Sequence, residues 1–156
     1  MWSGESLANY VRIMNNGKEK YKETDKAILC LVDLSDASQS ALRWATSMAR
    51  TLNAHLTILY TYRFLQPVKT EVLLLKKQSE GAALKKFLEW ESEILADKHV
   101  NYDFRSEVGF VADRVEDYVS KNPVILLAIH KPIVHDNKET VQQLIDQLKV
   151  PMVIIP

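Results

Sequence analysis

The amino-acid sequence predicts an α/β domain in which an open parallel sheet is covered by helices on both faces. Short, nearly continuous apolar runs alternate along the chain with segments whose apolar residues repeat at helical spacing. The apolar runs are rich in aliphatic and β-branched residues, as is typical of strands buried on both faces. Strands that alternate with helices require right-handed crossovers and therefore form a parallel sheet.

The elements follow from the pattern in chain order. The first strand is AILCLVD (27–33), and the following LSDASQ begins a helix, with Ser35 or Asp36 as the capping residue and Gln39 completing a capping box with Asp36. The remaining elements are expected as a strand at 55–62, a long charged helix at about 69–97, a strand at 100–108, a helix in FVADRVEDYVSK, a strand at 123–130, a helix carrying Val141, Leu144, Ile145 and Leu148, and a strand at 152–156.

Residues 1–26 are expected to form an N-terminal arm in front of a single domain at 27–156. The arm is polar and charged, and it contains a turn-prone Asn-Asn-Gly. Leu7, Val11 and Met14 are spaced to form one apolar stripe on a short helix. The stripe would dock on the domain or on a second copy, unless the arm is a frayed terminus.

Composition excludes several classes of protein. Lys plus Arg and Asp plus Glu each number 20, so the formal net charge is zero, which gives no electrostatic reason to expect nucleic acid or an anionic membrane as a partner. Cys30 is the single cysteine, so no internal disulfide forms and a reducing compartment is favoured. No apolar run approaches the ~20 residues of a membrane helix, and no secretory signal is visible. We therefore expect a soluble, cytoplasmic protein.

Three segments carry a distinctive set of motifs. In the first, an apolar strand ends in Asp and is followed by Ser and by a helix with an alanine-rich AL-x-WA face, at Asp33, Ser35, Ala41, Leu42, Trp44 and Ala45. The second is VGFVADRVEDYV, which has Gly109 in the glycine position of a Val-x-Gly stretch before the third helix, and the third is the strand VPMVIIP. Over roughly residues 26–156, these motifs resemble those of the universal stress protein family.

The resemblance implies a flavodoxin-like sheet of strand order 3-2-1-4-5 and a homodimer paired through the last strand, Met152 to Pro156. It also implies a contact between Asp33 and adenine. Were nucleotide binding retained, with ATP or AMP as the ligand, the binding residues would be Asp33, Ser35, Gly109, Lys131 and Thr140. Asp33 has a second interpretation, as a structural residue that orients the turn after the first strand.

The sequence departs from the family at the segment that holds phosphate. Nucleotide-binding members carry Gly-x2-Gly-x9-Gly-Ser/Thr between the fourth strand and fourth helix, where glycines let backbone N–H groups approach the phosphates. Here LLAIHKPIVHDNKET (126–140) contains no glycine, and none follows Gly109. Glu139 and Thr140 stand where Gly-Ser is expected, and the loop is several residues short.

The residues of this loop also disfavour phosphate on physical grounds. Pro132 has no backbone donor, and the β-branched Ile133 is poor at positive φ. Asp136 and Glu139 have the spacing of a capping box, which would satisfy the helix N-terminus with side chains of this chain. Repulsion between like charges costs on the order of several kcal/mol in a partly buried site, against about 0.3–2 kcal/mol from a helix N-terminus.

We therefore expect a non-catalytic, dimeric regulatory or interaction module in a stress response, with no cofactor and an unidentified protein partner. One alternative is a nucleotide-binding switch of the same fold that uses Asp33 with Lys131 or Lys138. A weaker alternative is a hydrolase of a small ligand in the same crevice, where ligands bind in this architecture.

The remaining polar residues favour structural roles. His130, His135 and Asp136 match no standard metal spacing, so no metal site is expected. A Ser35–His130–Asp33 triad lacks the nucleophile elbow that such triads require, so no catalytic residue is expected. Cys30 is expected to be buried and inert. Trp90, within EWESE, is expected to face solvent or a partner.

Overall fold

Five strands form one parallel sheet in the order β3-β2-β1-β4-β5, which is the flavodoxin-like order expected from the sequence. The computed structural model describes residues 26–64, 72–96, 99–136 and 138–156, so the N-terminal arm, apart from Lys26, lies outside the described residues. The strands are β1 (Ala27–Leu31), β2 (His55–Tyr62), β3 (Tyr102–Val108), β4 (Val124–His130) and β5 (Met152–Ile155).

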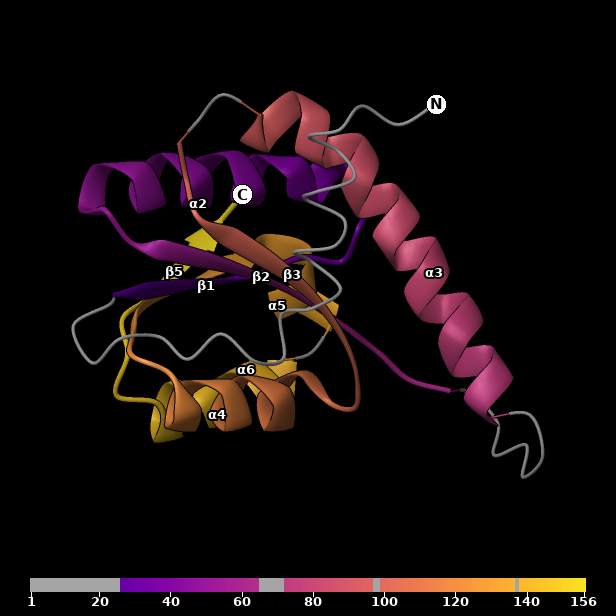
Figure 1. Ribbon diagram of the computed structural model, residues 1–156. Helices are drawn as coiled ribbons and strands as arrows, with labels where there is room; N and C mark the ends of the chain where they lie inside the picture. Colours follow the sequence, from indigo (N-terminus) through magenta and orange to yellow (C-terminus); the bar gives the residue numbers. More distant parts are fainter. Residues whose placement is uncertain (1–25, 65–71, 97–98, 137) are drawn as a thin grey trace.

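Helices cover both faces of the sheet. They are η1 (Asp36–Ser38), α2 (Gln39–Leu52), α3 (Val72–Trp90), the π-helical turn η2 (Glu91–Leu95), α4 (Val111–Lys121), α5 (Lys131–Asp136) and α6 (Lys138–Gln147). Figure 1 shows α2 and α3 on one face and α4 and α6 on the other, with α3 extending past the edge of the sheet. In the described part of the chain, no helix has the length and apolarity needed to cross a membrane.

The central strand β1 is buried along its whole length, which explains its continuous apolar sequence. Ile28 and Cys30 pack in the core beneath α2 and α3, whereas Leu29 and Leu31 pack in the core beneath α4 and α6. Burial raises the pKa of the Cys30 thiol to about 12, so the thiol is protonated and unreactive at neutral pH.

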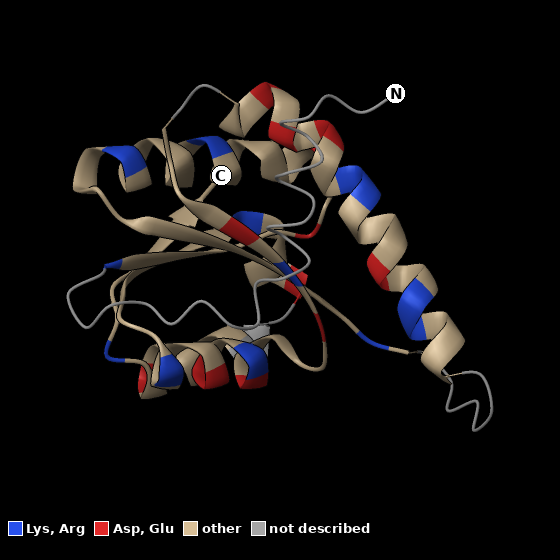
Figure 2. Ribbon diagram, in the orientation of Figure 1, with Lys and Arg blue, Asp and Glu red and all other residues tan. Residues whose placement is uncertain are grey.

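The prediction that Trp90 faces solvent or a partner was wrong, because its side chain is 2% exposed. Ala83, Phe87 and Trp90 follow one another at helical spacing, and Ile94 continues the same buried stripe. Glu89 and Glu93 are exposed, whereas Glu91 is buried and its carboxylate accepts a hydrogen bond from the Tyr102 hydroxyl. Acidic and basic residues are interspersed along α3 and α4 (Figure 2).

The start of α2 differs from the predicted capping box. Ser35 is the N-cap of the short helix η1, and Ser38 is the N-cap of α2. Neither side chain makes a capping hydrogen bond. Asp36 instead pairs with Lys86 of α3 at 3.1 Å. A second difference lies at residues 131–136, which were expected to form a loop and form the short helix α5.

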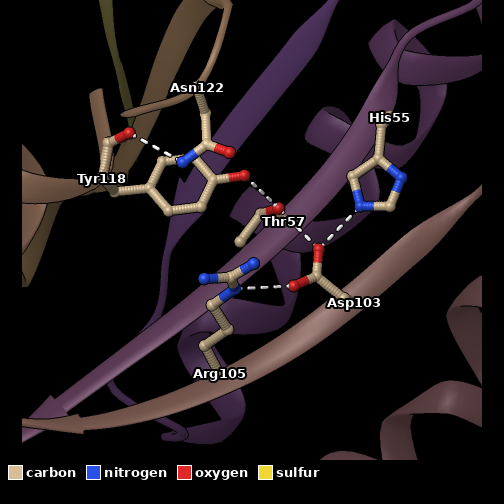
Figure 3. Close-up of polar contacts among 6 residues, drawn as sticks. All are labelled: His55, Thr57, Asp103, Arg105, Tyr118 and Asn122. Carbon is tan, nitrogen blue, oxygen red and sulfur yellow. Dashed lines mark hydrogen bonds and ion pairs between the residues drawn. The ribbon is translucent and has the colours of Figure 1, made fainter. Parts of the chain in front are cut away.

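A buried polar network joins β2, β3 and α4 (Figure 3). Asp103 is 1% exposed, and its Oδ1 contacts His55 Nε2 and accepts a hydrogen bond from the Thr57 hydroxyl, both at 2.6 Å. Its Oδ2 accepts a hydrogen bond from Arg105 Nε at 2.7 Å. The Thr57 hydroxyl also bonds the Tyr118 hydroxyl at 2.6 Å, which ties α4 to the sheet.

The network keeps Asp103 ionised despite its burial. Burial by itself raises the pKa of this carboxyl, but the hydrogen bonds from His55, Thr57 and Arg105, with the Arg105 charge, outweigh it and lower the pKa below the ordinary value of 3.8. A depressed folded-state pKa means that Asp103 contributes stability above its unfolded-state pKa and loses it as the pH falls through the folded-state pKa.

We expect Asp103→Asn to lower the free energy of unfolding at neutral pH by at least about 2 kcal/mol, because hydrogen bonds to charged groups contribute about 1.5–3 kcal/mol each. The wild-type protein should lose stability below about pH 4 more steeply than the variant. Urea denaturation at several pH values measures both effects.

Asp117→Asn is the matched control. Asp117 pairs with Lys121 at 2.7 Å on the surface of α4, where solvent screens the pair. This variant should leave the free energy of unfolding almost unchanged. Equal effects of the two substitutions would show that the buried network does not stabilise the fold.

Candidate functional site

A cavity of about 180 Å³ lies at the carboxyl edge of the sheet, where ligands bind in open α/β folds. Its walls come from the ends of β1 and β2, from the turn between β3 and α4, and from α5. The lining residues are Leu31, Val32, Asp33, Tyr60, Thr61, Tyr62, Arg63, Gly109, Phe110, Val111 and Ile133.

Asp33 lines this cavity, as the sequence predicted, and Ser35 holds it in place. The Ser35 backbone N–H and hydroxyl both donate to Asp33 Oδ1, at 2.9 and 2.6 Å. Burial raises the pKa of Asp33, but the bonds from Ser35, then Ser38 and the His130 charge, lower it below the ordinary value. Asp33 is therefore an anion at neutral pH, and the role of Ser35 is to position this carboxylate.

The Ser35–His130–Asp33 arrangement is not a catalytic triad in this structure. The Ser35 hydroxyl donates to the carboxylate, whereas in a triad the nucleophile bonds the imidazole. His130 is 2% exposed at the end of β4, and neither of its ring nitrogens has a hydrogen-bond partner among the residues that the structure describes. His130 is thus a buried strand-end histidine.

Gly109 forms the turn between β3 and α4 and lines the cavity. Its φ of +138° is one that side chains disfavour, and its N–H donates to the Tyr62 carbonyl at 2.9 Å. A Cβ at this position would lie 3.2 Å from Arg114 Nε. The turn therefore requires glycine and directs Phe110 toward the mouth of the cavity.

The junction after β4 holds no glycine-rich loop. Helix α5 begins at Lys131, directly after the last residue of β4, and Ile133 on α5 is 7% exposed, packs in the core and lines the cavity. Lys131 is exposed and does not line the cavity. Thr140 belongs to α6, but its side chain, like those of Lys138 and Glu139, lies outside the described residues. The predicted capping box between Asp136 and Glu139 lies there too.

Metal-ligating side chains do not gather near the cavity. Over the described ranges, no three His, Cys, Asp or Glu residues lie close enough to hold an ion. His135 and Asp136 are exposed, with 3.3 Å between His135 Nδ1 and Asp136 Oδ1.

Arg63 and Phe110 also line the cavity, although the sequence did not predict either of them as a site residue. The Arg63 guanidinium lies 4.7 Å from the centroid of the Phe110 ring, and Phe110 is 56% exposed. Side chains alternate between the two faces of the sheet along β2 and into Arg63, the residue after it. This alternation predicts that Arg63 lies on the face opposite its neighbour Tyr62. The contact itself joins residues 47 positions apart by their numbering, and no local pattern predicts it.

A second surface feature is an apolar groove of about 320 Å³ between α6 and β5. The groove is lined by Leu144, Ile145, Leu148, Val150, Met152 and Ile154. Ile145 and Ile154 are 54% and 46% exposed, which is unusual for large aliphatic side chains in one place.

Comparison with known proteins gives a single family. The model of the Universal stress protein family matches residues 25–156. Similar solved structures include a universal stress protein, UspA, from Lactobacillus plantarum, with a TM-score of 0.67 and 23% identity over 86% of this chain and 100% of that chain. No curated protein matched the sequence.

Two other similar structures are described with a bound nucleotide. One is a universal stress protein in complex with cAMP, with a TM-score of 0.61 and 18% identity over 84% of this chain and 97% of that chain. The other is the universal stress protein from Archaeoglobus fulgidus in complex with dAMP, with a TM-score of 0.59 and 15% identity over 86% and 100%.

We expect Gly109→Ala to lower the free energy of unfolding by about 1–2 kcal/mol, because alanine at this φ is strained and its Cβ meets Arg114. Gly81→Ala is the matched control, since Gly81 lies within α3 with no atom within 4 Å of an added Cβ. This control should raise stability by about 0.5–1 kcal/mol. Chemical denaturation compares them, and a neutral Gly109→Ala would contradict the requirement for glycine.

Proposed function

The chain belongs to the universal stress protein family, and we propose that it is a non-catalytic, dimeric regulatory module of a stress response that does not bind ATP through a phosphate loop. The proposal rests on one observation, the replacement of that loop by α5. The helix follows β4 with no intervening residue, and its Ile133 packs into the core. Pro132 has no N–H group to offer a phosphate.

The size of the cavity supports the same conclusion. Its volume of about 180 Å³ is below the range of about 300–1,000 Å³ that is usual for pockets that enclose drug-sized ligands. A nucleoside triphosphate would have to place its phosphates beyond the cavity, beside α5. Asp136 is exposed there and would repel them.

A non-catalytic role is supported by the bonds of the polar residues at the cavity. The Ser35 hydroxyl donates to Asp33 but Ser35 does not line the cavity, so this hydroxyl is not presented as a nucleophile to a ligand there. The depressed pKa of Asp33 also makes it a weak base at neutral pH.

A homodimer through Met152 to Pro156 is supported by the exposed edge of the sheet. Strand β5 lies at the end of the strand order and pairs with β4, which leaves its other edge for a further strand. The apolar groove beside β5 would be covered by the same contact between two copies. A two-fold axis would bring identical grooves and edges together.

A nucleotide-binding switch is the second candidate. It is favoured by the placement of Asp33 and Gly109 at one cavity and by the structures described with cAMP and dAMP. Lys131 or Lys138 would then have to reach the phosphate.

We expect that millimolar ATP with magnesium leaves the melting temperature of the protein unchanged in a thermal-shift titration. A ligand present at about 100 times its Kd would stabilise the folded state by about 2.7 kcal/mol and raise the melting temperature by several degrees. AMP is titrated in parallel, because it tests the second candidate. A concentration-dependent rise with ATP would contradict the proposed function.

We expect Ile154→Asp to convert a dimer into a monomer, because it places a charge on the edge strand within the apolar groove. Light scattering after size-exclusion chromatography measures the mass. Ser47→Asp, an exposed position on α2 away from this groove, is the control and should remain dimeric. A monomeric wild-type protein, or a dimeric Ile154→Asp, would rule out this interface.

A further inference from the structure

The cavity contains two opposite charges that do not pair with each other. Asp33 follows β1 and Arg63 follows β2, and both line the same space. Within the described part of the chain, no ion pair joins the two side chains: Asp33 accepts its hydrogen bonds from Ser35, and Arg63 lies over Phe110. A ligand with two polar ends would bind both of these side chains, one at each end.

Arg63 projects toward the cavity because of the alternation along β2. Tyr60 packs against the core beneath α2 and α3, and the Tyr62 hydroxyl donates to Glu80 of α3 at 3.0 Å. The intervening Thr61 and the following Arg63 therefore project to the face covered by α4. There the Phe110 ring lies against the guanidinium at 4.7 Å.

This contact orients Arg63 for an anion. A guanidinium stacked on an aromatic ring loses much of its freedom, yet the N–H groups at its edge remain directed outward and can donate two parallel hydrogen bonds to a carboxylate or phosphate. The backbone of Phe110 is positioned by the turn at Gly109 and by α4, whose N-cap it forms. Phe110 is exposed because its ring supports the Arg63 guanidinium at the surface.

Part of the cavity lining is apolar, beside Tyr60, Thr61 and Tyr62. Leu31, Val111 and Ile133 all contribute side chains that belong to the core or pack against it. A ligand centre without polar groups matches these walls, because a buried polar group there would lack a partner.

We propose that the cavity binds a small organic ligand with an apolar centre, an N–H donor that bonds Asp33 and an anionic group that bonds Arg63. This ligand class rests on the proposed function, in which no phosphate loop is present. Among the described residues, Arg63 is then the cation that lines the cavity and can bind an anionic group. The volume of about 180 Å³ suits a molecule of one or two rings.

The test uses 4-aminobenzoate as the probe, with benzoate and aniline as probes that each lack one polar end. Chemical-shift titration of the 156-residue chain measures the affinity of each probe and locates its contact. We expect 4-aminobenzoate to bind about tenfold more tightly than either comparator, because a charge-assisted hydrogen bond is lost with each missing group.

Variants separate the two contacts. Arg63→Gln should abolish the advantage of 4-aminobenzoate over aniline, and Asp33→Asn should abolish its advantage over benzoate. Arg63→Lys keeps the charge but loses the stacked planar group, so it should retain only part of the affinity. Arg50→Gln, on the exposed surface of α2, is the control and should bind the probes like the wild-type protein.

The outcomes distinguish this inference from the proposed function. If none of the three probes shifts resonances at the cavity, or if Arg63→Gln binds them unchanged, the inference is overturned, whereas the absence of ATP binding would still support the proposed function. Binding of ATP in the same titration would overturn the proposed function, whatever the probes do.

Discussion

The structure depends on the burial of β1 on both faces. A central parallel strand whose every residue is buried needs helices above and below it, and the two cores that flank it contain most of the apolar residues of the chain. Right-handed crossovers then place all the strand ends with their following turns at one edge. The cavity lies there because the helices cover the faces of the sheet and leave its carboxyl edge to the turns.

The same burial shapes the junction after β4. Ile133 extends the core beneath α4 and α6 across the end of β4, so residues 131–136 form a helix that is anchored by this apolar side chain. The polar groups of the cavity, Asp33 and Arg63, follow β1 and β2. Asp33 is held by Ser35, and Arg63 is held by Phe110, so the remaining charges of the cavity lie away from α5.

The network around Asp103 shows how the fold accommodates charge in a buried position. A carboxylate that is 1% exposed would be costly alone, but both of its oxygens are bonded, and Arg105 supplies the opposite charge. The Tyr118 hydroxyl extends these bonds to α4. Because α4 begins at the turn that contains Gly109, the network also helps to fix the wall of the cavity that carries Phe110.

The sequence by itself determined the fold class, the order of the elements, the buried strands and the placement of Asp33 and Gly109 at the carboxyl edge. Periodicity is a local property, and it reports which face a residue occupies, so even the burial of Trp90 was available from its spacing to Phe87. Only the tertiary structure decided which polar groups meet. The pairs His55–Asp103 and Arg63–Phe110 join segments far apart in the chain, and their contacts depend on strand register and on the approach of α4 to the sheet. The distances between these side chains depend on how the whole core packs, and no single stretch of the sequence determines that packing.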